Sequence, residues 1–127
     1  MVDTAAKVLI VEDDVQIQKL LSAILSHDGV SSKVASDGKA ACDLLDSTKF
    51  DAIVLDLMLP RMNGFDVLRH LSIANPAMLE RTIIVTGASE RLYRNSPQIR
   101  HTRALLRKPF DVAKLQQEVA AACAVHH

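Results

Sequence analysis

The sequence is poor in cysteine. Its 127 residues include only Cys42 and Cys123, and neither has a second cysteine or a histidine nearby at the spacing of a metal site. Both fall in segments with helical character. We interpret them as small buried side chains of a protein from a reducing compartment.

Long hydrophobic runs are absent as well. No segment approaches the ~20 apolar residues that a membrane-spanning helix needs. The apolar run at residues 8–11 is too short for a signal peptide and is followed directly by acids. We therefore expect a cytoplasmic protein that makes no contact with a membrane.

The sequence also lacks an excess of one charge. Its 15 Lys and Arg balance 15 Asp and Glu, for a formal net charge of +0, which argues against direct nucleic-acid binding through a strongly basic surface. The charges cluster locally, because residues 89–108 contain six Lys or Arg and a single acid, Glu90. Two interpretations remain open for this run, a solvated face and a docking surface.

The length and the 49% hydrophobic content fit one compact domain. A chain of this size buries roughly two-thirds of its unfolded surface, enough for a core without disulfides or metals. We expect a single domain over residues 1–127 with its core at about 7–124. A second folded domain, and so an output domain, is not expected in this chain.

Short apolar strands alternate with segments of helical spacing. The strands are predicted at residues 7–11, 30–35, 52–55, 82–85 and 104–106. Helices are predicted at 15–26, after a cap at Asp37, after the turn at Asn63 and Gly64, and after a cap at Asp111. Between the last two strands, Pro97 predicts only a short or broken helix before Ser96.

Five such strand–helix units predict an α/β fold, a doubly wound (βα)5 domain with a five-stranded parallel sheet between two layers of helices. The ligand site of such a sheet lies outside the carboxyl ends of its strands. Polar residues follow four of the predicted strands, so they should meet at this edge: Glu12, Asp13, Asp56, Thr86 and Lys108.

The acids at this edge indicate a metal site. Three carboxylates repel one another unless a cation lies between them, and oxygen ligands suit Mg²⁺, with Mn²⁺ as a substitute. The other interpretation of Asp13 or Asp14 is a cap of the first helix. Asp56 follows four apolar residues, where a carboxylate is poorly solvated unless a metal or a lysine neutralises it; its alternative is a plain surface acid.

A phosphoryl-transfer site would use all of these groups. A carboxylate can attack phosphorus and form an aspartyl phosphate, and Mg²⁺ and a lysine would offset the charge on the transferred oxygens. Lys108 precedes Pro109, which biases the lysine backbone towards an extended conformation beside the site. Thr86 offers a hydroxyl, although by itself it is equally a β-branched strand residue without a chemical role.

Four strings of the sequence resemble the receiver domains of two-component response regulators. They are VLIVEDD, IVLDLMLPRMNGFDVL, IIVTGAS and LLRKPF, and the likeness runs from about residue 7 to about residue 124. The resemblance implies the CheY-like, flavodoxin-like fold. It also implies a phosphoacceptor that switches a partner-binding surface and catalyses only its own phosphorylation and dephosphorylation, rather than an enzyme with an external substrate.

The resemblance assigns roles to individual residues. Asp56 would be the phosphoacceptor. Asp13 and the backbone carbonyl of Met58 would join it as Mg²⁺ ligands, and Glu12 would act through a metal-bound water.

Further roles concern the phosphoryl group. Lys108 would pair with it, Thr86 would move to bond it, and the backbone N–H of Gly87 would add a donor. The bond between Lys108 and Pro109 would be a cis peptide.

The resemblance also implies partners. The phosphoryl donor would be a sensor histidine kinase or a histidine phosphotransfer protein. A homodimer through the face from the fourth helix to the last strand and helix would be a further partner.

The sequence departs from the family pattern in three places. Leu105 occupies the switch position where many receivers carry Tyr or Phe. The usual coupling of threonine movement to the flip of an aromatic ring is therefore not expected to operate in the same way. His101 and Thr102 stand where Gly-Ala is common. Met58 and Ala88 lack polar groups that would orient an attacking water, which predicts slow self-dephosphorylation.

Three alternatives compete with this interpretation. A receiver that acts as a phosphorylation-independent interaction module shares the fold but normally lacks one of the site residues. A phosphatase or phosphotransferase of the haloacid dehalogenase type would place a second Asp where Met58 stands. A flavodoxin-like cofactor binder would need a phosphate-binding loop where Glu12 and Asp13 stand.

Overall fold

The computed structural model describes residues 6–124. The elements follow one another as β1 (Lys7–Val11), α1 (Val15–His27), β2 (Ser31–Ala35), α2 (Gly38–Ser47), β3 (Ala52–Leu55), α3 (Gly64–Ala74), the 3₁₀ helix η1 (Pro76–Arg81), β4 (Thr82–Thr86), α4 (Glu90–Tyr93), the 3₁₀ helix η2 (Ile99–His101), β5 (Ala104–Arg107) and α5 (Val112–Ala124).

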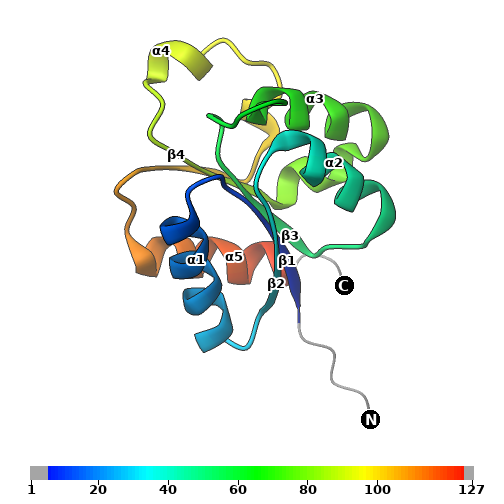
Figure 1. Cartoon of the computed structure of the whole chain (residues 1–127). Coiled ribbons are helices and arrows are strands. Elements are labelled where there is room, and N and C mark those ends of the chain that lie inside the picture. Colours follow the sequence, from blue (N-terminus) through cyan, green and yellow to red (C-terminus); the bar gives the residue numbers. More distant parts are fainter. Residues whose placement is uncertain (1–5, 125–127) are drawn as a thin grey trace.

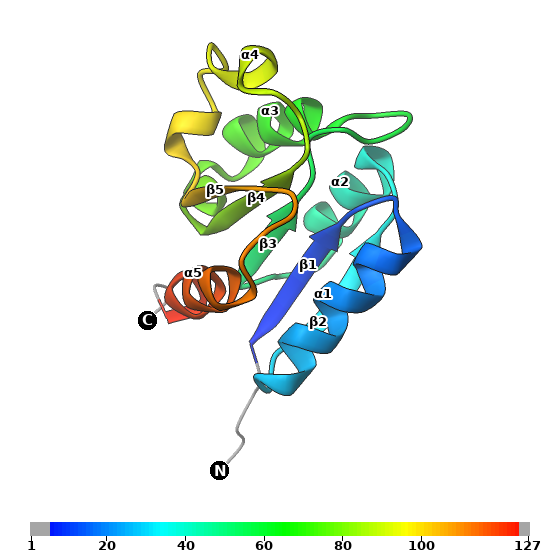
Figure 2. The same cartoon turned by 90° about the vertical axis from the view of Figure 1, so that its left-hand side faces the viewer.

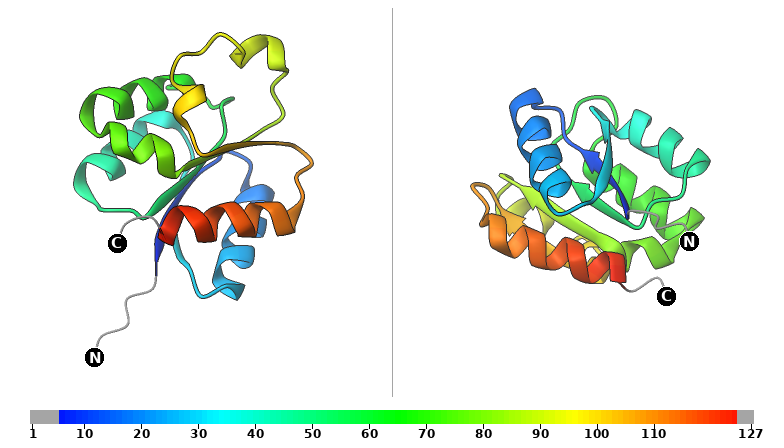
Figure 3. Two further views of the ribbon diagram at one scale, coloured as in Figure 1. Left: turned by 180° about the vertical axis from the view of Figure 1, so that it is seen from behind. Right: turned by 90° about the horizontal axis from the view of Figure 1, so that it is seen from below.

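The strands form one five-stranded parallel sheet in the order β2-β1-β3-β4-β5. Helices α1 and α5 cover one face, and α2 and α3 cover the other, so the molecule has three layers (Figures 1 and 3). From β1 the chain first adds β2 on one side, and then adds β3, β4 and β5 in turn on the other side, as in a doubly wound sheet. The predicted (βα)5 architecture is therefore confirmed.

Alternating strand residues build a core on each face of the sheet. Val8 and Ile10 of β1 join the cluster that faces α1 and α5, whereas Leu9 and Val11 join the cluster that faces α2 and α3. The central strand β3 is buried at every position. Because helices cover both faces, such strands are apolar throughout, which explains their unbroken hydrophobic runs.

Side chains at the helix starts satisfy exposed backbone N–H groups. The Asp14 carboxylate accepts from Gln16 N at 2.8 Å and from Ile17 N at 3.3 Å, so Asp14 caps α1. Asp37 caps α2, and Asp111 accepts from Lys114 N at 3.3 Å in the first turn of α5. Within the described residues, no helix has the length and apolarity to cross a membrane.

The segment from β4 to β5 differs most from a regular strand–helix unit. The predicted short helix before Ser96 is confirmed as α4, which has only four residues, none of them buried. In Figures 1 and 2 it stands out from the other helices at the top of the view. The 3₁₀ helices η1 and η2 were not predicted, because such short helices have no 3.6-residue periodicity in the sequence.

Gly64 lies inside a helix and not in the loop before it, where the sequence predicted the Asn63-Gly64 pair. The pair was interpreted as a loop marker, but Gly64 is the first residue of α3. Asn63 is its cap and forms a capping box with Asp66, in which each side chain accepts from the other's backbone N–H.

Candidate functional site

Four strand ends bring the predicted site residues to one edge of the sheet. Glu12 and Asp13 follow β1, Asp56 follows β3, Thr86 ends β4, and Lys108 follows β5. These strands are neighbours in one parallel sheet, so their carboxyl ends lie side by side. The structure thus places together residues that are as much as 96 positions apart in sequence.

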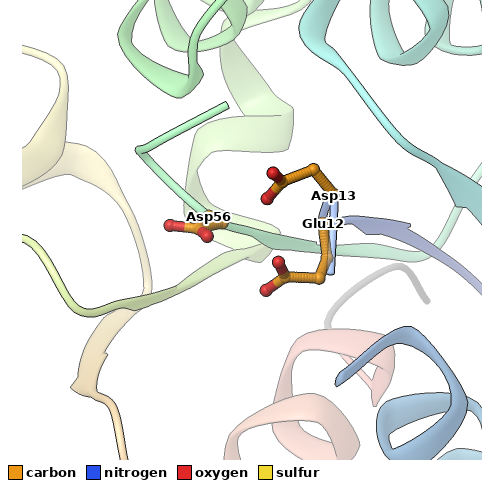
Figure 4. A group of neighbouring side chains, drawn as sticks. All are labelled: Glu12, Asp13 and Asp56. Carbon is orange, nitrogen blue, oxygen red and sulfur yellow. The ribbon is translucent and has the colours of Figure 1, made fainter. Parts of the chain in front are cut away.

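Three carboxylates gather at this edge. Oxygen atoms of Glu12, Asp13 and Asp56 all lie within 4.8 Å of one another. Figure 4 shows the three side chains around one spot, two from the end of β1 and one from the end of β3. Glu12 is 2% and Asp56 5% exposed, whereas Asp13 is exposed. An all-oxygen set with one side open to solvent fits Mg²⁺, which keeps several waters when it binds protein.

Lys108 offsets part of this negative charge. Its ammonium donates to Glu12 Oε1 at 2.7 Å and to Asp56 Oδ2 at 3.0 Å. The peptide bond between Lys108 and Pro109 is cis, as predicted. The lysine thereby links the buried acid of β1 to the acid of β3.

Burial and pairing shift the pKa values of the two buried partners. Burial raises the pKa of Glu12 above its ordinary value, against the opposing effects of the Lys108 ammonium and the Asp14 N–H. Burial alone would lower the pKa of Lys108, but the hydrogen bonds to Glu12 and Asp56 outweigh it, and the pKa is raised. Lys108 is therefore a firmly charged cation beside Asp56.

Backbone contacts fix the position of Asp56. Its Oδ1 accepts from Met58 N at 3.1 Å, and its own backbone N–H donates to Val11 O at 3.0 Å. The main chain of Met58 therefore lies next to the Asp56 carboxylate, while its side chain is 53% exposed. This places the predicted ligand residue at the site.

The predicted phosphoryl-stabilising residues Thr86 and Gly87 lie at the end of β4, and the predicted switch position Leu105 lies in β5. Thr86 is fully buried, and its hydroxyl oxygen accepts from Ala88 N at 3.1 Å. Gly87 follows Thr86 and is exposed. Leu105 is partly buried and packs on the core cluster that faces α2 and α3, as does Tyr93 of α4. Tyr93 of α4 thus packs on the same core cluster as Leu105 of β5.

Two glycines that support the site were missed as functional residues. A Cβ at Gly64 would lie 2.4 Å from Asp56 O and 2.5 Å from Leu57 Cα. A Cβ at Gly38 would lie 1.8 Å from Met62 O, in the loop between β3 and α3. Only a residue without a side chain allows these backbones to approach. The sequence signal was present, since each glycine follows a cap residue, but it suggested turns rather than contacts.

The fold and the site together define a class of protein. A doubly wound α/β domain with a buried aspartate, two further acids and a lysine at the carboxyl edge of its sheet is the arrangement of a CheY-like receiver domain. The sequence matches the response regulator receiver domain family over residues 8–120. The chain belongs to this family.

Curated relatives with similar sequences are response regulators. The response regulator MprA of Mycolicibacterium vanbaalenii is 43% identical over 65 residues, which are 51% of this chain and 28% of that protein. The response regulator ArlR of Staphylococcus epidermidis is 30% identical over 114 residues, which are 90% of this chain and 51% of that protein. The chain thus spans about half the length of the second relative and less of the first.

Solved structures share the fold. The receiver domain of the Francisella response regulator 1452 superposes with a TM-score of 0.80 at 26% identity, covering 94% of this chain and 97% of that chain. The receiver domain of the sensor histidine kinase PA1611 from Pseudomonas aeruginosa superposes with a TM-score of 0.84 at 24% identity. The match covers 95% of this chain and 99% of that chain. That second structure holds a magnesium ion in its active-site cleft.

Proposed function

We propose that Asp56 is the phosphoacceptor of this receiver domain and that its phosphorylation requires Mg²⁺. The observation that carries the proposal is the environment of Asp56. It is 5% exposed, within 4.8 Å of two other carboxylates and 3.0 Å from the Lys108 ammonium. A lone buried carboxylate at this spot would be costly, whereas a nucleophile held between a cation site and a lysine has a chemical use.

The residues divide the work of phosphoryl transfer. An Asp56 carboxylate oxygen attacks phosphorus, the new O–P bond forms as the bond to the donor breaks, and the leaving group takes the electron pair. Lys108 stabilises the negative charge on the phosphoryl oxygens. Thr86 and the Gly87 N–H donate to them once the group is in place.

Asp13, Asp56, the Met58 carbonyl and, through water, Glu12 would hold the metal. When bound, Mg²⁺ or Mn²⁺ supplies positive charge to the transferred oxygens. The charge of the acids and the backbone contact between Met58 and Asp56 support this set.

The phosphoryl donor is a phosphohistidine of a sensor kinase or phosphotransfer protein in the cytoplasm. An apolar groove beside Lys108 suits such a partner, and it is lined by Ile17, Leu20, Pro109, Phe110 and Val112. Leu20 is 48% and Val112 42% exposed. We place the donor there because exposed apolar side chains next to a reactive group mark a docking site.

The role of the groove is tested with a variant that should weaken docking of the phosphoryl donor without affecting phosphorylation by a small molecule. Leu20→Asp should slow transfer from a phosphotransfer protein that phosphorylates the wild type, but leave phosphorylation by acetyl phosphate unchanged. Leu92→Asp is the matched control, because Leu92 is 57% exposed on α4. Equal transfer rates for Leu20→Asp and Leu92→Asp would rule the groove out.

The phosphoacceptor itself is tested by the intact mass of the protein after incubation with acetyl phosphate and Mg²⁺. We expect one phosphoryl addition, lost in Asp56→Asn and in the presence of a chelator. No addition to a folded wild-type protein, from acetyl phosphate or from any phosphohistidine donor, would instead favour the phosphorylation-independent interaction module.

The lifetime of the phosphoryl group is expected to be long. Met58 and Ala88 carry no polar side chain to orient a water, and Ala88 is only 6% exposed. Met58→Asn should therefore shorten the lifetime several-fold in a pulse-chase measurement. An unchanged lifetime in this variant would contradict the assigned role of position 58.

A homodimer through α4, β5 and α5 is a second partner proposal, less favoured by the charges of this face. In a two-fold symmetric contact, the same surface meets itself. Arg91, Arg94 and Arg107 are exposed there, so like charges would approach one another. Sedimentation velocity with and without acetyl phosphate decides whether the chain dimerises.

A further inference from the structure

The segment between β4 and β5 contains an open hollow that the phosphoacceptor site does not use. Its volume is about 600 Å³. We call it the arginine hollow, and its main lining residues are Tyr93, Arg94, Asn95, Ser96, Ile99 and Arg100. It lies on the part of the chain where α4 is reduced to one short turn and η2 follows.

Four arginines in or next to this segment lack an acidic partner among the described residues. Among residues 6–124, Arg91, Arg94, Arg100 and Arg107 form no ion pair. Glu90 also lines the hollow, but it does not pair with Arg94 even though the two are four positions apart. By contrast, Arg103 of the same run pairs with Glu118 of α5 at 3.0 Å.

Little within the fold compensates these charges: Arg100 Nε donates to Pro97 O at 3.4 Å, but this acceptor is neutral. The Arg94 and Arg100 side chains line the same hollow, where like charges repel, and α4 contributes no buried residue that would compensate. The hollow also has an apolar part, because Tyr93 and Ile99 are only partly buried while they pack on the core. Arginine and tyrosine together are the residue types that carry most binding energy at protein interfaces.

We propose that the arginine hollow binds an acidic segment of a partner protein, with one apolar side chain of that segment seated against Tyr93 and Ile99. Guanidinium groups pair with carboxylates through two parallel hydrogen bonds, and clusters of arginine recognise acidic motifs in this way. The lining residues of this surface are separate from the carboxylate cluster that contains Asp56.

A peptide fits the hollow better than nucleic acid does. Nucleic-acid affinity depends on a long run of phosphate contacts, whereas this surface is short and the molecule is neutral overall, with three carboxylates at the end of its sheet. A second copy of the chain fits less well, because the same surface of that copy offers the hollow several basic residues and a single acid, Glu90, among residues 89–108.

The test uses the isotope-labelled full chain and a synthetic peptide of about twelve residues, in which a central Leu-Phe pair is flanked by glutamates. Amide signals of Tyr93, Arg94, Ile99 and Arg100 should shift on addition of the peptide. The double variant Arg94→Glu, Arg100→Glu should bind at least about tenfold more weakly. Peptides with Gln for Glu, or Ala for Leu-Phe, should also bind more weakly.

Lys19→Glu, Lys33→Glu is the control variant, because it makes the same change of net charge on exposed residues of α1 and β2. It should bind the acidic peptide nearly as the wild type does. Both variants should still be phosphorylated by acetyl phosphate, which shows that they fold. Equal weakening in both variants, equal binding of the Gln peptide, or no shift at about millimolar peptide would overturn the proposal.

Two further outcomes would reassign the hollow. If a single-stranded oligonucleotide of equal charge bound more tightly than the peptide, the partner would be a nucleic acid. If sedimentation showed a dimer of the wild type that Arg94→Glu, Arg100→Glu dissolves, the occupant would be a second copy. Either result would refute an acidic protein segment as the ligand.

Discussion

Gly64 sets how closely the start of α3 approaches the backbone of Asp56. Its N–H donates to Leu57 O at 3.0 Å, and a Cβ at this position would lie 2.4 Å from Asp56 O. The neighbouring atoms are backbone, which cannot yield as a flexible side chain would. The geometry of Asp56 therefore depends on the absence of a side chain eight positions after it.

Replacement of this glycine should destabilise the fold. We expect Gly64→Ala to lower the free energy of unfolding by about 1–3 kcal/mol, the usual cost of forcing atoms into a packed site. Gly87→Ala is the control, since a Cβ there meets nothing within 4 Å. Urea denaturation of both variants measures the difference. Equal midpoints would show that the α3 start shifts at no cost.

The exposed acid Asp13 should reveal the metal through stability. Without Mg²⁺, Asp13→Asn removes one of three repelling carboxylates, so the variant should melt at the wild-type temperature or slightly above it. With Mg²⁺, the wild type should gain stability by mass action and the variant should gain much less. Thermal unfolding with and without the metal measures both effects.

The control for this experiment is Asp111→Asn, which keeps a residue that can cap α5 and lies outside the acidic cluster. It should respond to Mg²⁺ as the wild type does. If Asp13→Asn were stabilised by Mg²⁺ as strongly as this control, Asp13 would not be a ligand.

At the scale of the elements, one hydrogen bond joins Thr86 of the site to the loop that leads to α4. The Thr86 hydroxyl oxygen accepts from Ala88 N at 3.1 Å, and Ala88 is the buried residue at the start of the loop that leads to α4. In the proposed function, Thr86 would turn to donate to the phosphoryl group, and Ala88 would lose this acceptor. The helix that follows has no side-chain cap to hold its start, and only Tyr93 packs on the core.

Tyr93 should therefore report phosphorylation. It is the single tyrosine of a chain without tryptophan, so the intrinsic emission at tyrosine wavelengths comes from α4. Acetyl phosphate with Mg²⁺ should change this emission in the wild type and leave it unchanged in Asp56→Asn. Thr86→Val should still gain mass on phosphorylation but show little change in emission, whereas Thr86→Ser should behave as the wild type. A full emission change in Thr86→Val would exclude this route.

Periodicity and helix caps in the sequence predicted most strands and helices. The sequence did not predict the features that depend on contacts between distant parts of the backbone. The buried strands and the capped helices agree within one or two residues, because apolar runs and residues such as Asp37 are local signals. The approaches of Gly64 to Asp56 and of Gly38 to Met62 are tertiary contacts. No local pattern predicts that Tyr93 of α4 packs on the core cluster that faces α2 and α3.

At the scale of the whole molecule, stability is concentrated in the sheet. The strand β3 pairs with β1 and β4 and contributes residues to both core clusters, Ile53 and Leu55 to one and Ala52 and Val54 to the other. Residues 89–101, by contrast, contain no buried side chain. The two parts of the chain should therefore open with very different free energies.

Native-state hydrogen exchange should distinguish the opening of the sheet from the opening of residues 89–101. Amides of β1, β3 and β4 should exchange only through global unfolding. Their exchange should therefore become faster when the domain is destabilised and slower when it is stabilised. Amides between Ser89 and His101 should exchange through local opening and stay fast when Gly64→Ala destabilises the fold. If the α4 segment instead shared the protection of β3, the segment would be part of the cooperative core. Phosphorylation could then move α4 only by loosening the whole domain.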